Sequence, residues 1–97
     1  MKNLKELIEY PKEGVLSKVI LKDPKLNITL FCMAKGTEIS EHTSTKAGFI
    51  HILEGNGIFN LEEKEIIMKP GELIIMKENQ IHSLKAIENT SFLLILY

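Results

Sequence analysis

Residues 36–55 read GTEISEHTSTKAGFIHILEG and residues 70–89 read PGELIIMKENQIHSLKAIEN, and these two stretches decide the fold that we predict. In the first, residues 49–53 form a nearly continuous apolar run that ends at residues 54–57 (EGNG), a sequence typical of a β-hairpin turn. The second begins within residues 69–72 (KPGE), which place proline and glycine where a type II turn requires them. Both stretches are therefore predicted to consist of short strands separated by turns.

The rest of the chain continues this pattern outward from the two stretches. In the run 26–34, Ile28, Leu30 and Cys32 share one face because successive side chains of a strand alternate. Besides residues 49–53, the predicted strands are residues 15–21, 26–34, 39–43, 58–61, 65–68, 73–76, 81–84 and 92–97. Eight or nine short strands at this spacing are typical of an antiparallel sandwich or barrel.

The N-terminal residues predict a short helix. Asn3 followed by Glu6 resembles a capping box, and Leu4, Leu7 and Ile8 then form one apolar stripe at helical spacing. We therefore expect an all-β fold, an antiparallel sandwich or barrel, with a short N-terminal helix. We expect it to form one domain over residues 1–97, with the helix and an arm at 1–14 and the strands at 15–97.

Length and composition fit one soluble domain and exclude several function classes. The chain has 97 residues, of which 44% are hydrophobic and 26% charged, enough for one core. A single cysteine excludes an intramolecular disulfide. Twelve lysines, no arginine and a formal net charge of −1 do not fit a nucleic-acid partner. The sequence shows no signal peptide and no apolar run near the ~20 residues of a membrane span, so we expect a cytoplasmic protein without a membrane partner.

The first quoted stretch resembles a signature segment of the cupin superfamily, whose members are small six- or eight-stranded β-barrels. That segment has Gly, five residues, His, one residue, His, three or four residues, Glu, six residues and Gly. Gly36, His42 and Gly55 match this frame. Ser44 stands in place of the second His, and Gly48 stands in place of the Glu.

The second quoted stretch resembles the other cupin segment, which has Gly, five residues, Pro, one residue, Gly, two residues, His, three residues and Asn. Gly71 and His82 match it, while Lys77, Asn79 and Ala86 replace the Pro, Gly and Asn. The resemblance covers about residues 15–97 and implies a small single-domain cupin, an antiparallel β-barrel of the jelly-roll type at residues 15–97, with a degenerate metal-ligand motif. Because one barrel hosts many functions, the resemblance predicts the fold more specifically than the chemistry.

In cupins that bind metal, three His and one carboxylate hold a divalent ion inside the barrel, and the resemblance places His42 and His82 at two of these positions. Ser44 offers a neutral hydroxyl, which is a poor substitute for imidazole on a transition metal, and Gly48 offers no side chain. Two imidazoles fall short of the three protein ligands that a catalytic zinc site keeps. The cofactor is therefore either a divalent ion (Zn, Mn, Fe or Ni) on His42 and His82 or none.

His51 and Cys32 complete the supply of soft metal ligands in the sequence. If residue 48 faces the barrel interior, strand alternation places Ile50 there too and points His51 outward. A bulge at Gly48 would reverse this orientation, since a lone glycine in a strand often marks a bulge. We favour the outward orientation for His51, at a surface or an interface, and we interpret Cys32 as a small buried hydrophobe.

The predicted ligand pocket is lined by His42, Ser44, Gly48, Ile50, Met76 and His82. An apolar interior with a few polar groups is typical of small-molecule sites, so our first hypothesis is a non-catalytic binding protein, such as a sensor or accessory protein. The second is a metal-dependent enzyme of the dioxygenase or isomerase type with a two-His site. The third is a metal-free acid–base catalyst in which His42 or His82 is the base, and Glu38 shares strand parity with His42.

Residues 49–53 (FIHIL) are apolar on both faces of the predicted strand. A strand that is hydrophobic on both sides needs cover on both sides. The barrel core covers one side, and a second subunit is the natural cover for the other. Small cupins commonly pair in this way, and a C2 dimer is the commonest closed form, so we expect a homodimer.

Overall fold

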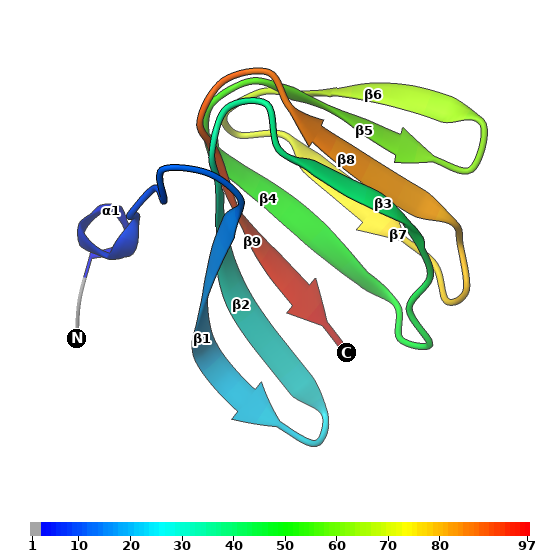
Figure 1. Ribbon diagram of the computed structural model, residues 1–97. Coiled ribbons are helices and arrows are strands. Elements are labelled where there is room, and N and C mark those ends of the chain that lie inside the picture. Colours follow the sequence, from blue (N-terminus) through cyan, green and yellow to red (C-terminus); the bar gives the residue numbers. More distant parts are fainter. Residues whose placement is uncertain (1–2) are drawn as a thin grey trace.

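The computed structural model describes residues 3–97, which form one short helix and nine strands (Figure 1). Asn3 caps helix α1 (Leu4–Leu7), and its side-chain oxygen accepts a hydrogen bond of 2.9 Å from the backbone N–H of Lys5. The strands are β1 (Val15–Asp23), β2 (Leu26–Met33), β3 (Glu38–His42), β4 (Gly48–Glu54), β5 (Gly57–Leu61), β6 (Lys64–Met68), β7 (Leu73–Met76), β8 (His82–Ala86) and β9 (Thr90–Leu96). The N-terminal helix and the strands predicted from the sequence are confirmed. Within residues 3–97, no helix has the length and hydropathy of a membrane span.

The strands form two antiparallel sheets that lie one over the other (Figure 1). The five-stranded sheet has the order β1-β2-β9-β4-β7, and the four-stranded sheet has the order β3-β8-β5-β6. Most neighbouring strands are far apart in sequence, as when the C-terminal β9 pairs with both β2 and β4. This arrangement confirms the predicted antiparallel jelly-roll-type barrel with a short N-terminal helix.

The turns decide which consecutive strands pair. β5 and β6 form a hairpin that turns at Glu62, whose φ is 54°. The turn at residues 69–72 forms as predicted, because the Glu72 N–H donates to the Lys69 carbonyl at 3.0 Å and Gly71 has a φ of 89°. The hairpin predicted at residues 54–57 is wrong. β4 pairs with β7 and β9, whereas β5 pairs with β6 and β8, so this segment carries the chain between sheets.

The first glycine of that segment, Gly55, allows the chain to cross from one sheet to the other. Gly55 has a φ of 105°, and a Cβ at this position would collide with the carbonyl oxygen of Asn89. Asn56 accepts backbone hydrogen bonds from Ile87 and Glu88 at 2.9 and 3.1 Å. A Gly-Asn-Gly sequence signals backbone freedom in hairpins and crossings alike, and the tertiary pairing decides between them.

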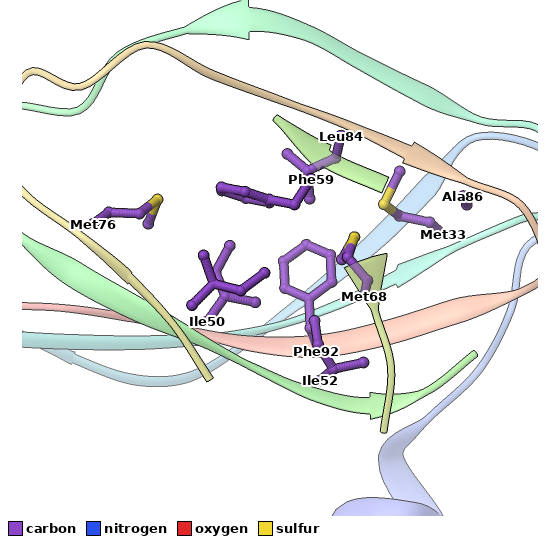
Figure 2. Close-up of a cluster of buried hydrophobic side chains, with 10 residues drawn as sticks. Met33, Ile50, Ile52, Phe59, Met68, Met76, Leu84, Ala86 and Phe92 are labelled. Carbon is purple, nitrogen blue, oxygen red and sulfur yellow. The ribbon is translucent and has the colours of Figure 1, made fainter. Parts of the chain in front are cut away.

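The hydrophobic core lies between the two sheets. Figure 2 shows Ile50, Ile52 and Phe92 from the five-stranded sheet facing Phe59 and Leu84 from the four-stranded sheet. The buried cluster consists of Met33, Ile50, Ile52, Phe59, Met68, Ile74, Met76, Leu84, Ala86 and Phe92. In β4 the buried residues alternate with half-buried ones, as a strand with one face on a core requires.

The N-terminal arm (residues 8–14) is attached to the outer face of the five-stranded sheet. The Tyr10 hydroxyl donates to Glu54 Oε1 at 2.8 Å and lies 3.0 Å from Ser91 Oγ. Burial is the largest cause that raises the pKa of Tyr10, to about 12. Leu30 and Cys32 alternate with core residues of β2, so they face this outer side, and both are fully buried. The arm thus closes part of the outer face.

Candidate functional site

A cavity of about 120 Å³ lies between the two sheets, near the end of β3 and the start of β8. It is lined by Phe31, Ile39, His42, Ile50, Met76, His82, Leu84, Phe92 and Leu94. A larger groove of about 410 Å³ crosses the outer face of the four-stranded sheet, but it is more open and is lined mainly by charged and polar residues. Because apolar walls with a few polar groups are typical of ligand sites, we take the inner cavity as the candidate site.

A β-bulge brings His42 into this cavity. In the β3–β8 ladder Ile39 lies opposite Leu84, whereas His42 lies opposite His82, so β3 has one residue more than β8 between these pairs. Regular alternation from Ile39 would place residue 41 inside and His42 outside. The extra residue reverses this parity, as bulges near the rims of barrels often do.

The same bulge overturns the predicted relation between Glu38 and His42. Their even spacing predicted that both side chains share one face. Glu38 instead pairs with Lys85 on the outer face, where Glu38 Oε1 lies 3.6 Å from Lys85 Nζ. Among residues 3–97, no carboxylate contributes to the cavity lining. Glu38 therefore does not share the face of His42, and it gives the acid–base hypothesis no carboxylate at the cavity.

His82 forms an inner wall of the cavity and His42 forms its mouth. His82 is 6% exposed, whereas His42 is exposed. The His82 ring stacks on Phe59, with ring centroids 5.7 Å apart and an angle of 10° between the planes. The His42 and His82 rings meet edge to face, with centroids 4.0 Å apart and an angle of 66°. Two residues separated by 40 positions in the sequence are therefore in direct contact.

Each of these histidines is oriented by the backbone carbonyl two residues before it. His42 Nδ1 lies 2.7 Å from the carbonyl oxygen of Ser40, and His82 Nδ1 lies 3.1 Å from that of Gln80. A carbonyl oxygen only accepts hydrogen bonds, so each Nδ1 carries a proton and donates it. In the neutral ring Nε2 then has a free lone pair and is the polar ring atom left for a ligand.

Burial keeps His82 neutral. The loss of solvation around a charged ring lowers the pKa of His82 from its ordinary value of 6.5. The hydrogen bond to Gln80 opposes this effect, and repulsion from His42 adds to it. At neutral pH, His82 therefore presents an acceptor at Nε2.

Ser44 and Gly48, which we predicted to line the pocket, lie outside the lining of this cavity. The Ser44 hydroxyl accepts from the backbone N–H of Lys46 at 3.1 Å, and the Ser44 carbonyl accepts from the Asn79 N–H at 2.7 Å. Ser44 therefore joins the loop before β4 to the loop before β8. At Gly48, a Cβ would collide with the carbonyl oxygen of Ile95, so the close approach of β4 to β9 requires a glycine.

His51 faces away from the cavity, as the alternation of β4 predicts. Its neighbours Ile50 and Ile52 are both in the core. Across the five-stranded sheet His51 pairs with Leu93 of β9 and Leu73 of β7, and it is half-buried. His51 is therefore on the outer face and does not contribute to the cavity that His42 and His82 share.

Sequence reasoning missed several residues of the cavity. The lining residues absent from the prediction are Phe31, Ile39, Leu84, Phe92 and Leu94. Strand alternation offers a signal for one of them, because Leu84 follows His82 by two residues and so shares its face. The carbonyls of Ser40 and Gln80 carry no such signal, since every residue has a carbonyl group.

The side chains at this site do not make the ligand set of a metal-binding cupin. Residues 3–97 contain no group of three or more His, Cys, Asp or Glu side chains arranged to hold a metal ion. The orientation of both Nδ1 atoms by carbonyls is common among metal-bound histidines. However, two Nε2 atoms are fewer than the three protein ligands of a catalytic zinc site, so the residues present do not fit such a metal.

Solved structures share this architecture. A conserved protein of unknown function from Streptococcus pyogenes matches with a TM-score of 0.90 and 26% identity, over 99% of this chain and 84% of that one. A cupin superfamily protein from Desulfitobacterium hafniense DCB-2 matches with a TM-score of 0.90 and 25% identity, over 96% of this chain and 85% of that one. A cupin 2 conserved barrel domain protein from Leptotrichia buccalis matches with a TM-score of 0.91 and 30% identity, over 98% of this chain and 46% of that one. Among curated proteins, none matches this sequence.

The sequence also matches a protein family directly. The family model described as "Cupin domain" matches residues 29–96, which run from within β2 to the end of β9. Most of the chain is thus included, together with His42, His82 and every other residue that lines the cavity. With the sequence match and the barrel fold in agreement, this chain belongs to the cupin family.

Proposed function

We propose that this cupin domain binds a small, mainly apolar molecule in the cavity beside His42 and His82. The observation that supports the proposal is the composition of the lining, in which these two histidines are joined by seven apolar side chains. Burying an apolar ligand there gains about 25 cal/mol per Å² of surface removed from water, and the histidines add directional contacts.

We further propose that the bound molecule leaves unchanged, as in a sensor or accessory protein. In a two-base reaction such as epimerisation, the proton donor and the proton acceptor stand on opposite faces of the reacting carbon, each within hydrogen-bond reach of the proton it transfers. Here the two polar side chains of the lining contact each other, and Glu38 faces outward. A cytoplasmic location stays a prediction from the sequence.

A pair of matched variants on β9 tests the binding site. Leu94 lines the cavity, and Leu93 points to the outer face of the same sheet. Leu94→Phe enlarges a side chain inside the cavity, whereas Leu93→Phe makes the same change outside. We expect compounds from a library of small neutral metabolites to shift the amide NMR resonances of Ile50 and Leu84 in the wild type and in Leu93→Phe, and not in Leu94→Phe. Equal shifts in both variants, or no compound that shifts these resonances in the wild type, would overturn the proposal.

A metal-dependent enzyme of the dioxygenase or isomerase type is the second candidate function. The specific observation in its favour is that His42 and His82 are in contact and both leave Nε2 free. The test is a calorimetric titration of the untagged protein with Zn(II), Mn(II), Fe(II) or Ni(II). One equivalent of metal bound by the wild type and lost in His42→Ala would favour this function. Binding that is equal in both proteins would remove it.

We also propose that a second copy of the chain covers the outer face of β4 and β7. The outer patch there consists of Phe49, His51, Leu73, Ile75 and Leu93. Leu73 is 57% exposed and Ile75 is 69% exposed, which is unusual for large apolar side chains on neighbouring strands. The patch has no Lys, Asp or Glu, so two copies meet there without repulsion between like charges. A C2 dimer is the simplest closed assembly of this kind.

A further inference from the structure

We propose that the cavity selects small ligands that carry a hydrogen-bond donor, an O–H or N–H group, and that this donor binds Nε2 of His82. The inference rests on the proposed function, binding in this cavity, and adds the chemical class of the ligand. Size, polarity and the direction of the hydrogen bonds each support it.

The size of the cavity limits the ligand. The volume of the cavity is about 120 Å³. A cavity of about 150 Å³ lined by Leu, Ile and Phe holds one benzene molecule. The part of the ligand that enters this cavity therefore has about five or six non-hydrogen atoms, the size of a five-membered ring or a short branched chain. Larger ligands have to leave the remainder at the mouth beside His42, which is exposed.

The lining limits the polarity of that enclosed part. Seven of the nine lining residues are apolar, and the charged side chains of residues 3–97 are absent from the lining. A polar ligand group that entered without a partner would lose its hydrogen bonds to water, which weakens binding roughly fivefold to a hundredfold. The enclosed part of the ligand is therefore apolar except for the group that meets the histidines.

The histidine tautomer decides which polar group that is. Since His82 Nδ1 donates to the carbonyl of Gln80, the neutral ring offers a lone pair at Nε2 and no second N–H. A carbonyl, ether or carboxylate oxygen would place its own lone pair against this atom. A hydroxyl or N–H group would instead donate to it. His42 Nδ1 likewise donates to the carbonyl of Ser40.

The buried polar side chains of the free protein give a second reason why the ligand carries a hydrogen-bond donor. Within residues 3–97, no side-chain nitrogen or oxygen is both fully buried and without a hydrogen-bond partner. His82 as a residue is 6% exposed, so a ligand in the cavity would remove the remaining access of water to its ring. A ligand without a donor would then leave Nε2 buried and unpaired, and a ligand with a donor avoids that penalty.

Three five-membered rings of similar size test the inference. Pyrrole carries an N–H donor, whereas thiophene and furan carry none. We expect each ring to shift the amide resonances of Ile50 and Leu84 in NMR titrations, and pyrrole to bind roughly three- to tenfold more tightly than the other two. We also expect pyrrole, and not thiophene, to shift the ¹⁵N resonance of His82 Nε2. Equal affinities for the three rings would overturn the donor requirement and leave the proposed function standing. No shift of the cavity resonances by any ring would overturn both.

A His82→Phe variant is the matched control. It keeps an aromatic ring to stack on Phe59 and removes the acceptor atom. We expect thiophene to bind this variant about as well as the wild type and pyrrole to lose its advantage. If pyrrole keeps its advantage in His82→Phe and loses it in His42→Phe, the assignment to His82 is wrong. Should either variant fail to fold, the Nε2 resonance of the wild-type protein decides the same question without a substitution.

Discussion

The two faces of β4 differ in what covers them, although both carry large apolar side chains. On the inner face, Ile50 and Ile52 are 2% and 0% exposed because the four-stranded sheet packs over them. On the outer face, Phe49 and His51 are half-buried, and Ile75 of the adjacent β7 is 69% exposed. The inner face thus has its cover within the chain, and the outer face does not.

The outer face of β2, unlike that of β4, is covered by another part of the chain. Leu30 and Cys32 are fully buried on that side, and Tyr10 of the N-terminal arm is hydrogen-bonded to Glu54 nearby. One half of the outer face is therefore closed within the chain, and the β4–β7 half is open. Antiparallel sheets with one solvated face usually place polar residues on it. The apolar residues of the open half therefore support our proposal that a second copy of the chain packs there.

Substituting a phenylalanine on each face by alanine is expected to change stability most. Phe59 is fully buried in the core, and Phe49 is half-buried on the outer patch. We expect Phe59→Ala to lower the free energy of unfolding by about 3–5 kcal/mol, because it removes core contacts and leaves a cavity. Phe49→Ala is expected to cost about 1–2 kcal/mol, since less area returns to water. Urea unfolding at low protein concentration, where association contributes least, measures both. Equal losses would mean that the two faces are packed alike.

The second effect concerns assembly. Leu73→Asp combined with Ile75→Asp places charges on the outer patch, and burying unpaired charges in an interface is unfavourable. We expect the dimer, about twice 11.0 kDa, to dissociate at least tenfold more readily while the monomer stays folded. Light scattering across a concentration series measures this. Ile67→Asp is the control, because Ile67 is 45% exposed on β6 in the other sheet. A wild-type monomer at every concentration would contradict the dimer.

The smallest effect concerns the pH dependence of stability on the inner side. The pKa of His82 is lowered in the folded state, so the unfolded chain takes up a proton first as the pH falls below 6.5. The free energy of unfolding is therefore expected to fall as the pH drops below 6.5. We expect this decrease with pH to be smaller in His82→Phe than in the wild type. Chemical denaturation at pH 7.5 and about pH 5 compares the two proteins, with His51→Phe as the control on the outer face. A slope that is unchanged in His82→Phe would exclude a contribution from His82.

Much of the fold was predictable because strands and turns leave local signals. Every strand was found from apolar and β-branched runs, and the turn at residues 69–72 from its proline and glycine. The segment 54–57 was assigned wrongly because its glycines serve a crossing between sheets. A local sequence shows where the chain turns, but the partner of the next strand depends on residues far away.

The candidate site was predictable only in part. His42 and His82 were identified from their motif positions, and the structure places both in one cavity with Ile50 and Met76. The parity of Glu38 with His42 was wrong, because a bulge in β3 adds one residue to the count. A bulge depends on the pairing of two strands, and neither strand records it alone.

Local sequence was enough to predict the strands, the alternation of core and outer residues in β4, and the importance of His42 and His82. These follow from local propensity and from a period of two, which neighbouring residues specify. The pairing of distant strands was needed to place His42 at the cavity, to bring its ring centroid 4.0 Å from that of His82, and to direct both Nδ1 atoms to backbone carbonyls. The reason is that side-chain direction near a bulge and contact across 40 residues both depend on strand pairing.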